Sequence, residues 1–317
     1  MDSLLVTKAL ELIQASHKIL VTTHVRPDGD AIGSMLGLGL SLLSAGKDVQ
    51  MTLSDTVPVN MRHLEGSKQV VQEVDDAFDM SITVDCSDSQ RIGWNLKTQT
   101  APDLNIDHHP TNENFGKINL VDPSASATAE ILTELLPLWR LPISAGVAFA
   151  LLTGIITDTI GFRTSNVTAR TMRNAAELID HGAKISELYL SALVHRSYES
   201  TKFWGAGLSH IERNGGLVWT KLTIEDRKKA GYSGRDDADL INVLSAIKDA
   251  SIAIIFVEQP GGSVKVSWRA QPGFDVAGLA LRFGGGGHIA AAGAELKGTL
   301  DEVMPRVLKD THGLLVY

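Results

Sequence analysis

Side chains of the types that bind metal ions follow four separate apolar segments of this chain. The segments span residues 19–21, 82–84, 104–106 and 147–156, and the polar residues after them are His24, Asp28, Asp30, Asp85, Asp107, His108, His109 and Asp158. Carboxylates and imidazoles at the edge of a hydrophobic core are costly unless something pairs with them. Four groups in the same position relative to their segments therefore predict a shared site at one edge of a sheet.

The predicted site offers carboxylate and imidazole ligands and no thiolate. This donor mix suits Mn, Fe or Mg ions, and a site so rich in carboxylates can hold two of them. Each cluster also has a plainer explanation. Asp30 and Asp158 are plausible helix-capping residues, and Asp85 is a plausible turn residue at the end of a strand.

The Asp107-His108-His109 cluster sets a limit on ligand geometry. Adjacent side chains at the end of an extended segment point in different directions, so the three cannot all bind one ion. We expect one histidine to be a ligand and the other to face substrate or to pair elsewhere. A pair of surface histidines is the plainer alternative.

Composition restricts the class of protein and of substrate. The chain has 317 residues, 44% of them hydrophobic and 21% charged, which predicts a globular protein of two domains. Its net charge is −8, whereas proteins that grip long nucleic acids usually carry a basic surface. We therefore expect no long duplex partner, and any phosphate substrate should be small and held by local groups.

A cytoplasmic location and no membrane association are expected from three features. The apolar segment 147–156 is shorter than the roughly 20 residues that span a bilayer. The first residues lack the pattern of a signal peptide. The single cysteine, Cys86, excludes an intrachain disulfide, and with no basic neighbour in sequence it is better explained as a small buried residue than as a nucleophile.

The first half of the chain alternates between extended and helical patterns. Strands are expected at residues 18–23, 49–53, 81–84 and 103–106, and helices at 4–15 and 31–45. Such alternation predicts an α/β fold, a mostly parallel sheet with helices on both faces, whose functional groups gather beyond the carboxyl ends of the strands. Three further helices are expected at 125–138, 144–157 and 166–179, the last with Asn166 as its cap and Gly182 as its stop.

A second, smaller α/β unit follows a helical segment at 185–207. Strands are expected at 217–222, 252–257 and 264–268, and helices at 238–247, 276–283 and 300–308, with a glycine-rich turn before the last helix. The expected division is a catalytic domain at residues 1–185, a helical connector at 186–210 and a substrate-binding domain at 211–317.

The glycine-rich segment of this second unit can recognise an anion. Consecutive glycines let a backbone approach a ligand closely, and their N–H groups can form an anion-binding nest. Arg269 offers a planar fork that matches phosphate, and His288 adds a donor. A flexible hairpin loop is the plainer alternative.

These motifs together resemble the DHH phosphoesterase family, RecJ-like branch. Asp107-His108-His109 is similar to the motif that names the family, residues 24–34 to its first motif, Asp85 to its second and Asp158 to its fourth. Ser267-Trp268-Arg269 and the run from Gly284 to His288 resemble the DHH-associated C-terminal domain. The one variation is Trp268, where the family leads us to expect phenylalanine.

The resemblance implies two Mn²⁺ ions, with Mg²⁺ or Co²⁺ as possible substitutes. One ion would be held by His24, Asp28 and Asp85, and the other by Asp30, Asp85, His108 and Asp158, with Asp85 bridging. His109 would face the scissile phosphate, and Asp107 would orient a neighbouring side chain. The nucleotide would be clamped across a cleft between the domains by Arg269, Gly285, Gly286, Gly287 and His288.

The activity implied by the resemblance is hydrolysis of short RNA. In its length and domain order, the chain is most similar to family members that cleave oligoribonucleotides to mononucleotides and remove the 3′-phosphate of 3′-phosphoadenosine 5′-phosphate. Hydrolysis of c-di-AMP or linear dinucleotides is the enzymatic alternative, and a nucleotide-binding sensor without turnover is the non-enzymatic one. Inorganic pyrophosphatase activity is disfavoured by the nucleotide clamp. A homodimer is compatible with the pattern.

Overall fold

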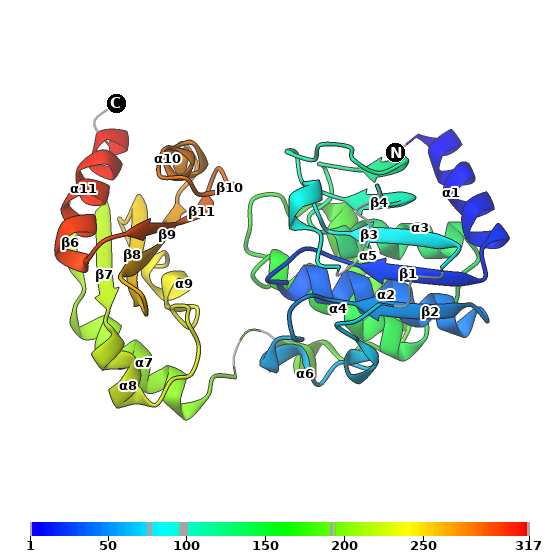
Figure 1. The fold of residues 1–317 in the computed structure, drawn as a ribbon, viewed down its shortest axis with the longest axis horizontal. Coiled ribbons are helices and arrows are strands. Elements are labelled where there is room, and N and C mark those ends of the chain that lie inside the picture. The colour runs from blue at the N-terminus through cyan, green and yellow to red at the C-terminus, as the bar shows by residue number, and fades with distance from the viewer. Residues whose placement is uncertain (1, 75–77, 95–100, 191–192, 194, 316–317) are drawn as a thin grey trace. The chain divides into compact units, whose positions relative to one another are not determined.

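The computed structural model describes residues 2–74, 78–94, 101–190, 193 and 195–315, and the side chain of His288 lies outside this description. The chain divides into two compact units, Met1–His195 and Arg196–Tyr317 (Figure 1). The segment expected as a connector is thus shared between them, because α6 (Ile185–Tyr189) lies in the first unit and α7 (Tyr198–Ser209) in the second. Within the described ranges, no helix is both long and apolar enough to cross a membrane.

The first unit is built on a parallel sheet of five strands. Its order is β2-β1-β3-β4-β5, with bounds β1 Lys18–Thr22, β2 Asp48–Thr52, β3 Met80–Val84, β4 Leu104–Asp107 and β5 Ile118–Val121. The four strands expected from the sequence are confirmed within about two residues, whereas β5 was not expected. The strands β3 and β4 are buried throughout, as parallel strands covered on both faces should be.

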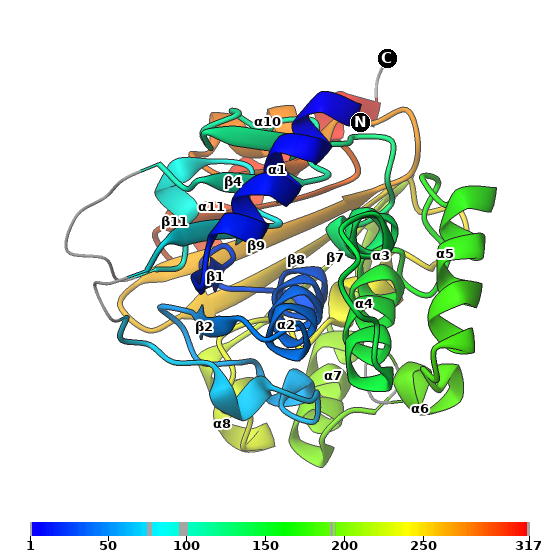
Figure 2. The ribbon, with the colours of Figure 1, turned by 90° about the vertical axis from the view of Figure 1, so that its right-hand side faces the viewer.

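The helices of the first unit bring distant segments together. Their bounds are α1 Ser3–Ala15, α2 Gly29–Ser44, α3 Thr128–Leu138, α4 Ala145–Asp158 and α5 Ala169–Asp180. The helix α2 packs on the sheet, and α3 and α4 lie beside it (Figure 2). Close approach of α2 and α4 depends on Gly33, because a Cβ there would collide with the carbonyl oxygen of Ala150.

The second unit is built on a mixed sheet of six strands. Its order is β10-β11-β9-β8-β7-β6, with bounds β6 Glu212–Asn214, β7 Leu217–Leu222, β8 Ile252–Gln259, β9 Ser263–Ala270, β10 Gly286–His288 and β11 Ala291–Lys297. Only β7 and β8 pair in parallel. The helices are α7, α8 Ile224–Ala230, α9 Leu240–Leu244, α10 Val276–Arg282 and α11 Leu300–His312.

Successive side chains of β8 pack alternately into two hydrophobic cores of the second unit. Ile254 and Phe256 belong to a core with residues of α10 and α11, whereas Ile255 and Val257 belong to a core with residues of α7 and α9. Because successive side chains of a strand point to opposite faces, a central strand of this kind needs cover on both sides.

Several local expectations were wrong, each for a physical reason. The helix expected at 166–179 is capped by Thr168, whose hydroxyl accepts the N–H groups of Arg170 and Thr171, and not by Asn166. The helix expected at 238–247 is confined to α9. The strand β10 was missed because glycine has low strand propensity, and its pairing with β11 replaces part of the expected glycine-rich turn.

Candidate metal centre and active site

The first cluster lies on the loop between β1 and α2. His24 follows the end of β1 by two residues and is 6% exposed. Oδ1 of Asp28 accepts the N–H groups of Asp30 and Ala31, so this exposed aspartate is the N-cap of α2. The cap holds both Asp28 and Asp30 at the start of the helix, at the carboxyl edge of the sheet.

Asp85 stands directly after β3 in an unusual backbone conformation. Its φ is +52°, in the left-handed region that non-glycine residues seldom adopt and that is common at functional sites. The carboxylate is 1% exposed, and its Oδ2 lies 3.7 Å from Nε2 of His24. Its Oδ1 accepts a hydrogen bond of 3.0 Å from Oγ1 of Thr128, the first residue of α3.

Asp30 is fixed by donors from two helices. Its Oδ1 accepts hydrogen bonds from Oγ of Ser34 at 3.1 Å and from the backbone N–H of Ala129 at 3.0 Å. Its Oδ2 accepts the backbone N–H of Thr128 at 2.6 Å. The N-terminus of α3 therefore donates to a carboxylate of α2, an arrangement favoured by the unpaired N–H groups and dipole of a helix start.

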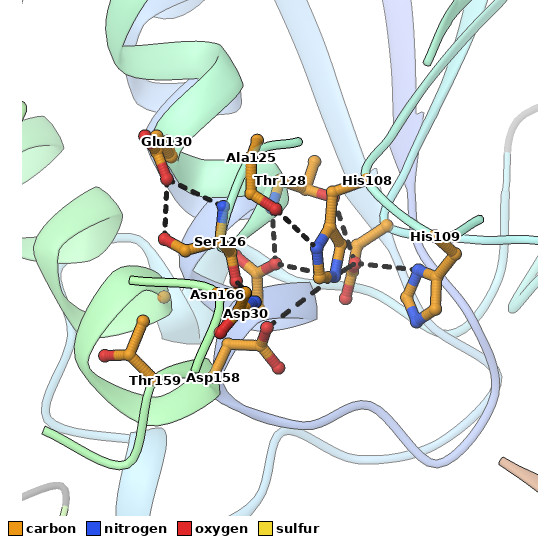
Figure 3. A network of polar contacts seen from close by, with 12 residues as sticks. Asp30, His108, His109, Ala125, Ser126, Thr128, Glu130, Asp158, Thr159 and Asn166 are labelled. Atoms are coloured by element: carbon orange, nitrogen blue, oxygen red, sulfur yellow. Dashed lines mark hydrogen bonds and ion pairs between the residues drawn. The ribbon is translucent and has the colours of Figure 1, made fainter. Parts of the chain in front are cut away.

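His108 lies among three of the carboxylates (Figure 3). Its Nε2 is 3.7 Å from Oδ1 of Asp85, 3.7 Å from Oδ2 of Asp158 and 4.0 Å from Oδ2 of Asp30. Asp158 is the last residue of α4, and its side chain is 28% exposed, so it forms the accessible rim of the cluster.

Both buried histidines point Nε2 toward the carboxylates. Nδ1 of His108 lies 3.4 Å from the carbonyl oxygen of Ala125, and Nδ1 of His24 lies 2.9 Å from that of Val25. A carbonyl partner favours a proton on Nδ1 and leaves the lone pair of Nε2 available to a ligand, the usual arrangement of metal-binding histidines. Nη2 of Arg91 also lies 3.3 Å from Nδ1 of His24, but the carbonyl contact is shorter.

His109 is turned toward a different partner. Its Nδ1 lies 2.7 Å from Oδ1 of Asp107 and 3.6 Å from Oδ1 of Asp85. Although burial opposes the charged form, these carboxylates raise the pKa of His109 to about 9, which favours the protonated ring in the metal-free protein. Asp107 also accepts Nδ2 of Asn112 at 2.5 Å, and despite burial these bonds lower its pKa.

The cluster of carboxylates is unfavourable without a cation. Burial, together with the neighbouring acidic groups, raises the pKa values of Asp30, Asp85 and Asp158 to about 7. Carboxylates that repel one another, together with imidazole donors, are the donor set of a divalent ion such as Mn²⁺ or Mg²⁺. The residues present therefore fit bound divalent metal.

Three overlapping groups have ligand atoms within 4.8 Å of one another. They are His24 with Asp28 and Asp85, Asp30 with His108 and Asp158, and Asp85 with His108 and His109. All metal-site residues expected from the sequence thus come together, although they lie on different segments of the chain. Cys86 stays outside these groups: burial raises the pKa of its thiol to about 12, and Sγ donates to the carbonyl of Asp88.

Residues that position this site were missed by the sequence analysis. Neither Thr128 nor Asn112 was expected to be a site residue. Glu130 is fully buried, and its Oε2 accepts the N–H and Oγ of Ser126 at 2.7 and 2.6 Å, which shapes the turn before α3 (Figure 3). Ser126 and Glu130 are four residues apart, one more than the spacing of a capping box, so no local motif signalled this contact.

In the second unit, Trp268 and Arg269 point to opposite faces of β9. Trp268 is fully buried, and its Nε1 donates to Oγ1 of Thr311 at 3.1 Å, so the aromatic ring serves the core. Arg269 lies opposite Ala291 of β11 and is flanked on its face by the small residues Ser267 and Gly293. Burial lowers the pKa of its guanidinium, while the nearby carboxylates of the α9 region oppose this effect.

The glycine run has two different roles along its length. A Cβ on Gly285 would collide with the carbonyl oxygen of Gly293, and a Cβ on Gly287 with that of Ala291, so both are required by strand packing. A Cβ on Gly286 would meet no described atom within 4 Å. Open space at Gly286 leaves this part of the backbone approachable. His288 was also expected to bind the phosphate, and its side chain lies outside the described part of the structure.

Comparison with known proteins adds two matches that together cover both units. Residues 18–155 match the DHH family, N-terminal domain, and residues 217–315 match the DHHA1 domain. Over 310 residues, the chain is 36% identical to the "Bifunctional oligoribonuclease and PAP phosphatase NrnA" of Thermus thermophilus, covering 96% of this chain and 92% of that protein.

Solved structures share the same architecture. An exopolyphosphatase-related protein from Bacteroides fragilis has a TM-score of 0.88 and 25% identity, covering 98% of this chain and 96% of that one. RecJ from Thermus thermophilus in complex with Mn²⁺ has a TM-score of 0.55 and 14% identity, covering 98% of this chain and 54% of that one. The second similarity concerns the fold alone.

Proposed function

Because the chain belongs to the DHH family of phosphoesterases, we propose that it hydrolyses very short RNA to mononucleotides and removes the 3′-phosphate of 3′-phosphoadenosine 5′-phosphate. The observation that carries the proposal is the pairing of two ligand groups, His24-Asp28-Asp85 and Asp30-His108-Asp158, joined where His108 meets Asp85. Near full-length similarity to an oligoribonuclease and PAP phosphatase supports the choice of substrates over c-di-AMP.

The proposal assigns two divalent ions, preferably Mn²⁺, to these two groups. His24, Asp28 and Asp85 hold one, and Asp30, Asp85, His108 and Asp158 hold the other. Bound divalent ions supply Lewis-acid activation and neutralise negative charge that develops at phosphorus. The absence of any thiolate from the ligand groups favours Mn²⁺ or Mg²⁺ over softer ions.

The remaining side chains of the site act on charge and orientation. In its protonated form, which Asp107 favours, His109 can stabilise negative charge on the phosphoryl oxygens. Asp107 holds that ring through Nδ1, so its role is to orient the histidine. Thr128 donates its hydroxyl to Asp85 and its backbone N–H to Asp30, so it holds the two ligand groups close together.

We assign recognition of the nucleotide to the second unit. Arg269, the backbone of Gly285, Gly286 and Gly287, and His288 would bind a phosphate of the substrate. Small residues beside Arg269 and the open space at Gly286 support this assignment. A guanidinium is suited to bidentate contact with phosphate oxygens.

A substrate panel with Mn²⁺ tests the proposed function. It compares kcat/KM on RNA of two to five nucleotides, RNA of about 20 nucleotides, 3′-phosphoadenosine 5′-phosphate, c-di-AMP and pyrophosphate. The proposal requires the short RNAs and 3′-phosphoadenosine 5′-phosphate to be the best substrates, because the acidic chain offers no long electrostatic track. Higher efficiency on c-di-AMP, on pyrophosphate or on the long RNA contradicts it.

A further inference from the structure

A pocket whose lining shares no residue with the metal-ligand groups has no role in the chemistry described so far. It measures about 430 Å³ and lies in the first unit, in the connection between β2 and β3. Its lining combines apolar, polar and charged side chains: Asp55, Thr56, Val57, Arg62, Ser67, Lys68, Val70 and Gln72. A mixed lining of this type suits a ligand that has both an apolar and an anionic part.

The cations of this pocket are available to a ligand. Nε of Arg62 donates to the carbonyl oxygen of Val57 at 3.0 Å, which anchors the guanidinium and leaves its terminal N–H groups to other partners. Among the residues that the structure describes, no acidic side chain forms an ion pair with Arg62 or Lys68. Two unpaired cations in one pocket are a notable local excess in a chain whose net charge is −8.

Asp55, the acidic residue of the pocket lining, accepts a hydrogen bond from the loop that carries His24 and Asp28. Oδ2 of Asp55 accepts the backbone N–H of Arg26 at 2.6 Å. Arg26 has a left-handed φ of +55° and stands two residues from both His24 and Asp28. Asp55 therefore ties the wall of the pocket to the loop that carries two of the proposed metal ligands.

The sheet places Asp55, one residue of the pocket lining, one strand away from His24. The strands β1 and β2 are parallel neighbours whose last residues, Thr22 and Thr52, are register partners. His24 follows the first of these ends, and Asp55 follows the second. Because neighbouring strands are about 4.8 Å apart, a chain of nucleotides can extend from one strand end to the next.

We propose that this pocket binds a phosphate-bearing nucleotide of the RNA substrate beyond the one at the metal centre. Arg62 and Lys68 contact its phosphate, and Val57 and Val70 line the side facing the apolar part of the nucleotide. The proposal rests on the proposed function, since it concerns the same substrate. It gives the protein a binding site that RNA of three or more nucleotides can use and that 3′-phosphoadenosine 5′-phosphate cannot.

The test compares two substrates in one double variant, Arg62→Ala with Lys68→Ala. The measured quantity is the ratio of kcat/KM for a trinucleotide to kcat/KM for 3′-phosphoadenosine 5′-phosphate. Loss of two phosphate contacts should lower this ratio about tenfold, and added salt should reduce the difference between variant and unaltered protein. The matched control replaces two exposed cations of the same unit outside the pocket, Lys8→Ala with Arg173→Ala, and should leave the ratio unchanged.

Each other outcome overturns the proposal in a recognisable way. If the unaltered protein cleaves the trinucleotide and the variant keeps its kcat/KM on both substrates, the pocket does not bind substrate and the proposed function stands. An equal loss on both substrates gives a structural role to Arg62 and Lys68. If the variant changes only inhibition by free AMP, the pocket binds free nucleotide instead of RNA. Failure of the unaltered protein on both substrates overturns the proposed function together with the pocket.

Discussion

Oγ1 of Thr128 lies 3.0 Å from Oδ1 of Asp85, across 43 residues of sequence. The backbone N–H of the same threonine donates to Asp30. One residue at the start of α3 therefore restrains a carboxylate from each of the two proposed ligand groups. This contact is the simplest structural explanation of how the groups stay together in one site.

Replacement of Thr128 by valine should slow catalysis while preserving the fold. The change removes the hydroxyl that fixes Asp85 but keeps the backbone N–H bond to Asp30. We expect kcat/KM to fall about tenfold, since a hydrogen bond to a charged group is worth about 1.5 kcal/mol or more. Steady-state kinetics with Mn²⁺ measures this.

Thr133→Val is the matched control for this variant. Thr133 is buried in the same helix, and its hydroxyl donates to the carbonyl of Ala129. Equal losses of activity in the two variants would mean that Thr128 acts through helix stability and not through Asp85.

Asp85→Asn should abolish turnover and reduce metal binding. A carboxylate shared by both ligand groups affects both ions when it is neutralised, so the bound metal should fall by more than one site. Metal content after dialysis and turnover should be measured on the same sample, with circular dichroism as the check on folding. A variant that keeps two ions and a near-normal rate would show that Asp85 does not bridge.

The metal-free protein should become less stable as pH rises. Asp30, Asp85 and Asp158 have pKa values near 7 when folded, against an ordinary value of 3.8, so the folded chain binds more protons between these limits. The stability contributed by these protonated groups is present below about pH 4 and is lost as pH rises through about 7. Mn²⁺ replaces the protons, so the metal-induced rise in Tm should grow between about pH 5 and pH 7.5.

Thermal unfolding with and without Mn²⁺ across this range measures the effect. The difference in Tm between the two conditions is the relevant quantity, because acidic groups remote from the site affect both curves alike. A difference that does not change with pH would contradict the account of the carboxylate cluster.

Gly286→Val should impair substrate binding without affecting metal. A Cβ at Gly286 would meet no described atom within 4 Å, so we expect the fold to tolerate valine there, whereas the side chain would block the backbone that we assign to the substrate phosphate. We expect KM to rise about tenfold, and Arg269→Ala to act in the same direction. Gly205→Val is the control, because a side chain there also enters open space. The assignment fails if Gly286→Val leaves KM unchanged or releases metal.

The parallel core and the convergence of the candidate metal-binding residues could be predicted because their signals are local. Apolar runs that end in aspartate or histidine mark β1, β3 and β4 together with the residues that follow them. Parallel strands bring such residues to one edge of the sheet whatever their order in sequence. The prediction therefore needed only the apolar pattern of the strands and their parallel direction. It did not need any distance between residues.

The features that were missed depend on partners far away in sequence. The strand β5 is apolar at Ile118, Leu120 and Val121, but a run of four residues is too short to be recognised as a strand by its pattern alone. The strand β11 begins with alanine and glycine, and its strand structure comes from pairing with β9. Thr128 acts through Asp85, and no local pattern around it shows that contact.

Dependence of RNA cleavage on metal is the most direct test of the whole account. The measurement is the rate of dinucleotide hydrolysis by protein that has been exhaustively chelated and then reconstituted with increasing Mn²⁺. The account predicts no turnover after chelation and full recovery as about two ions bind per chain. Undiminished turnover in the chelated protein, or no turnover after two ions have bound, would contradict it.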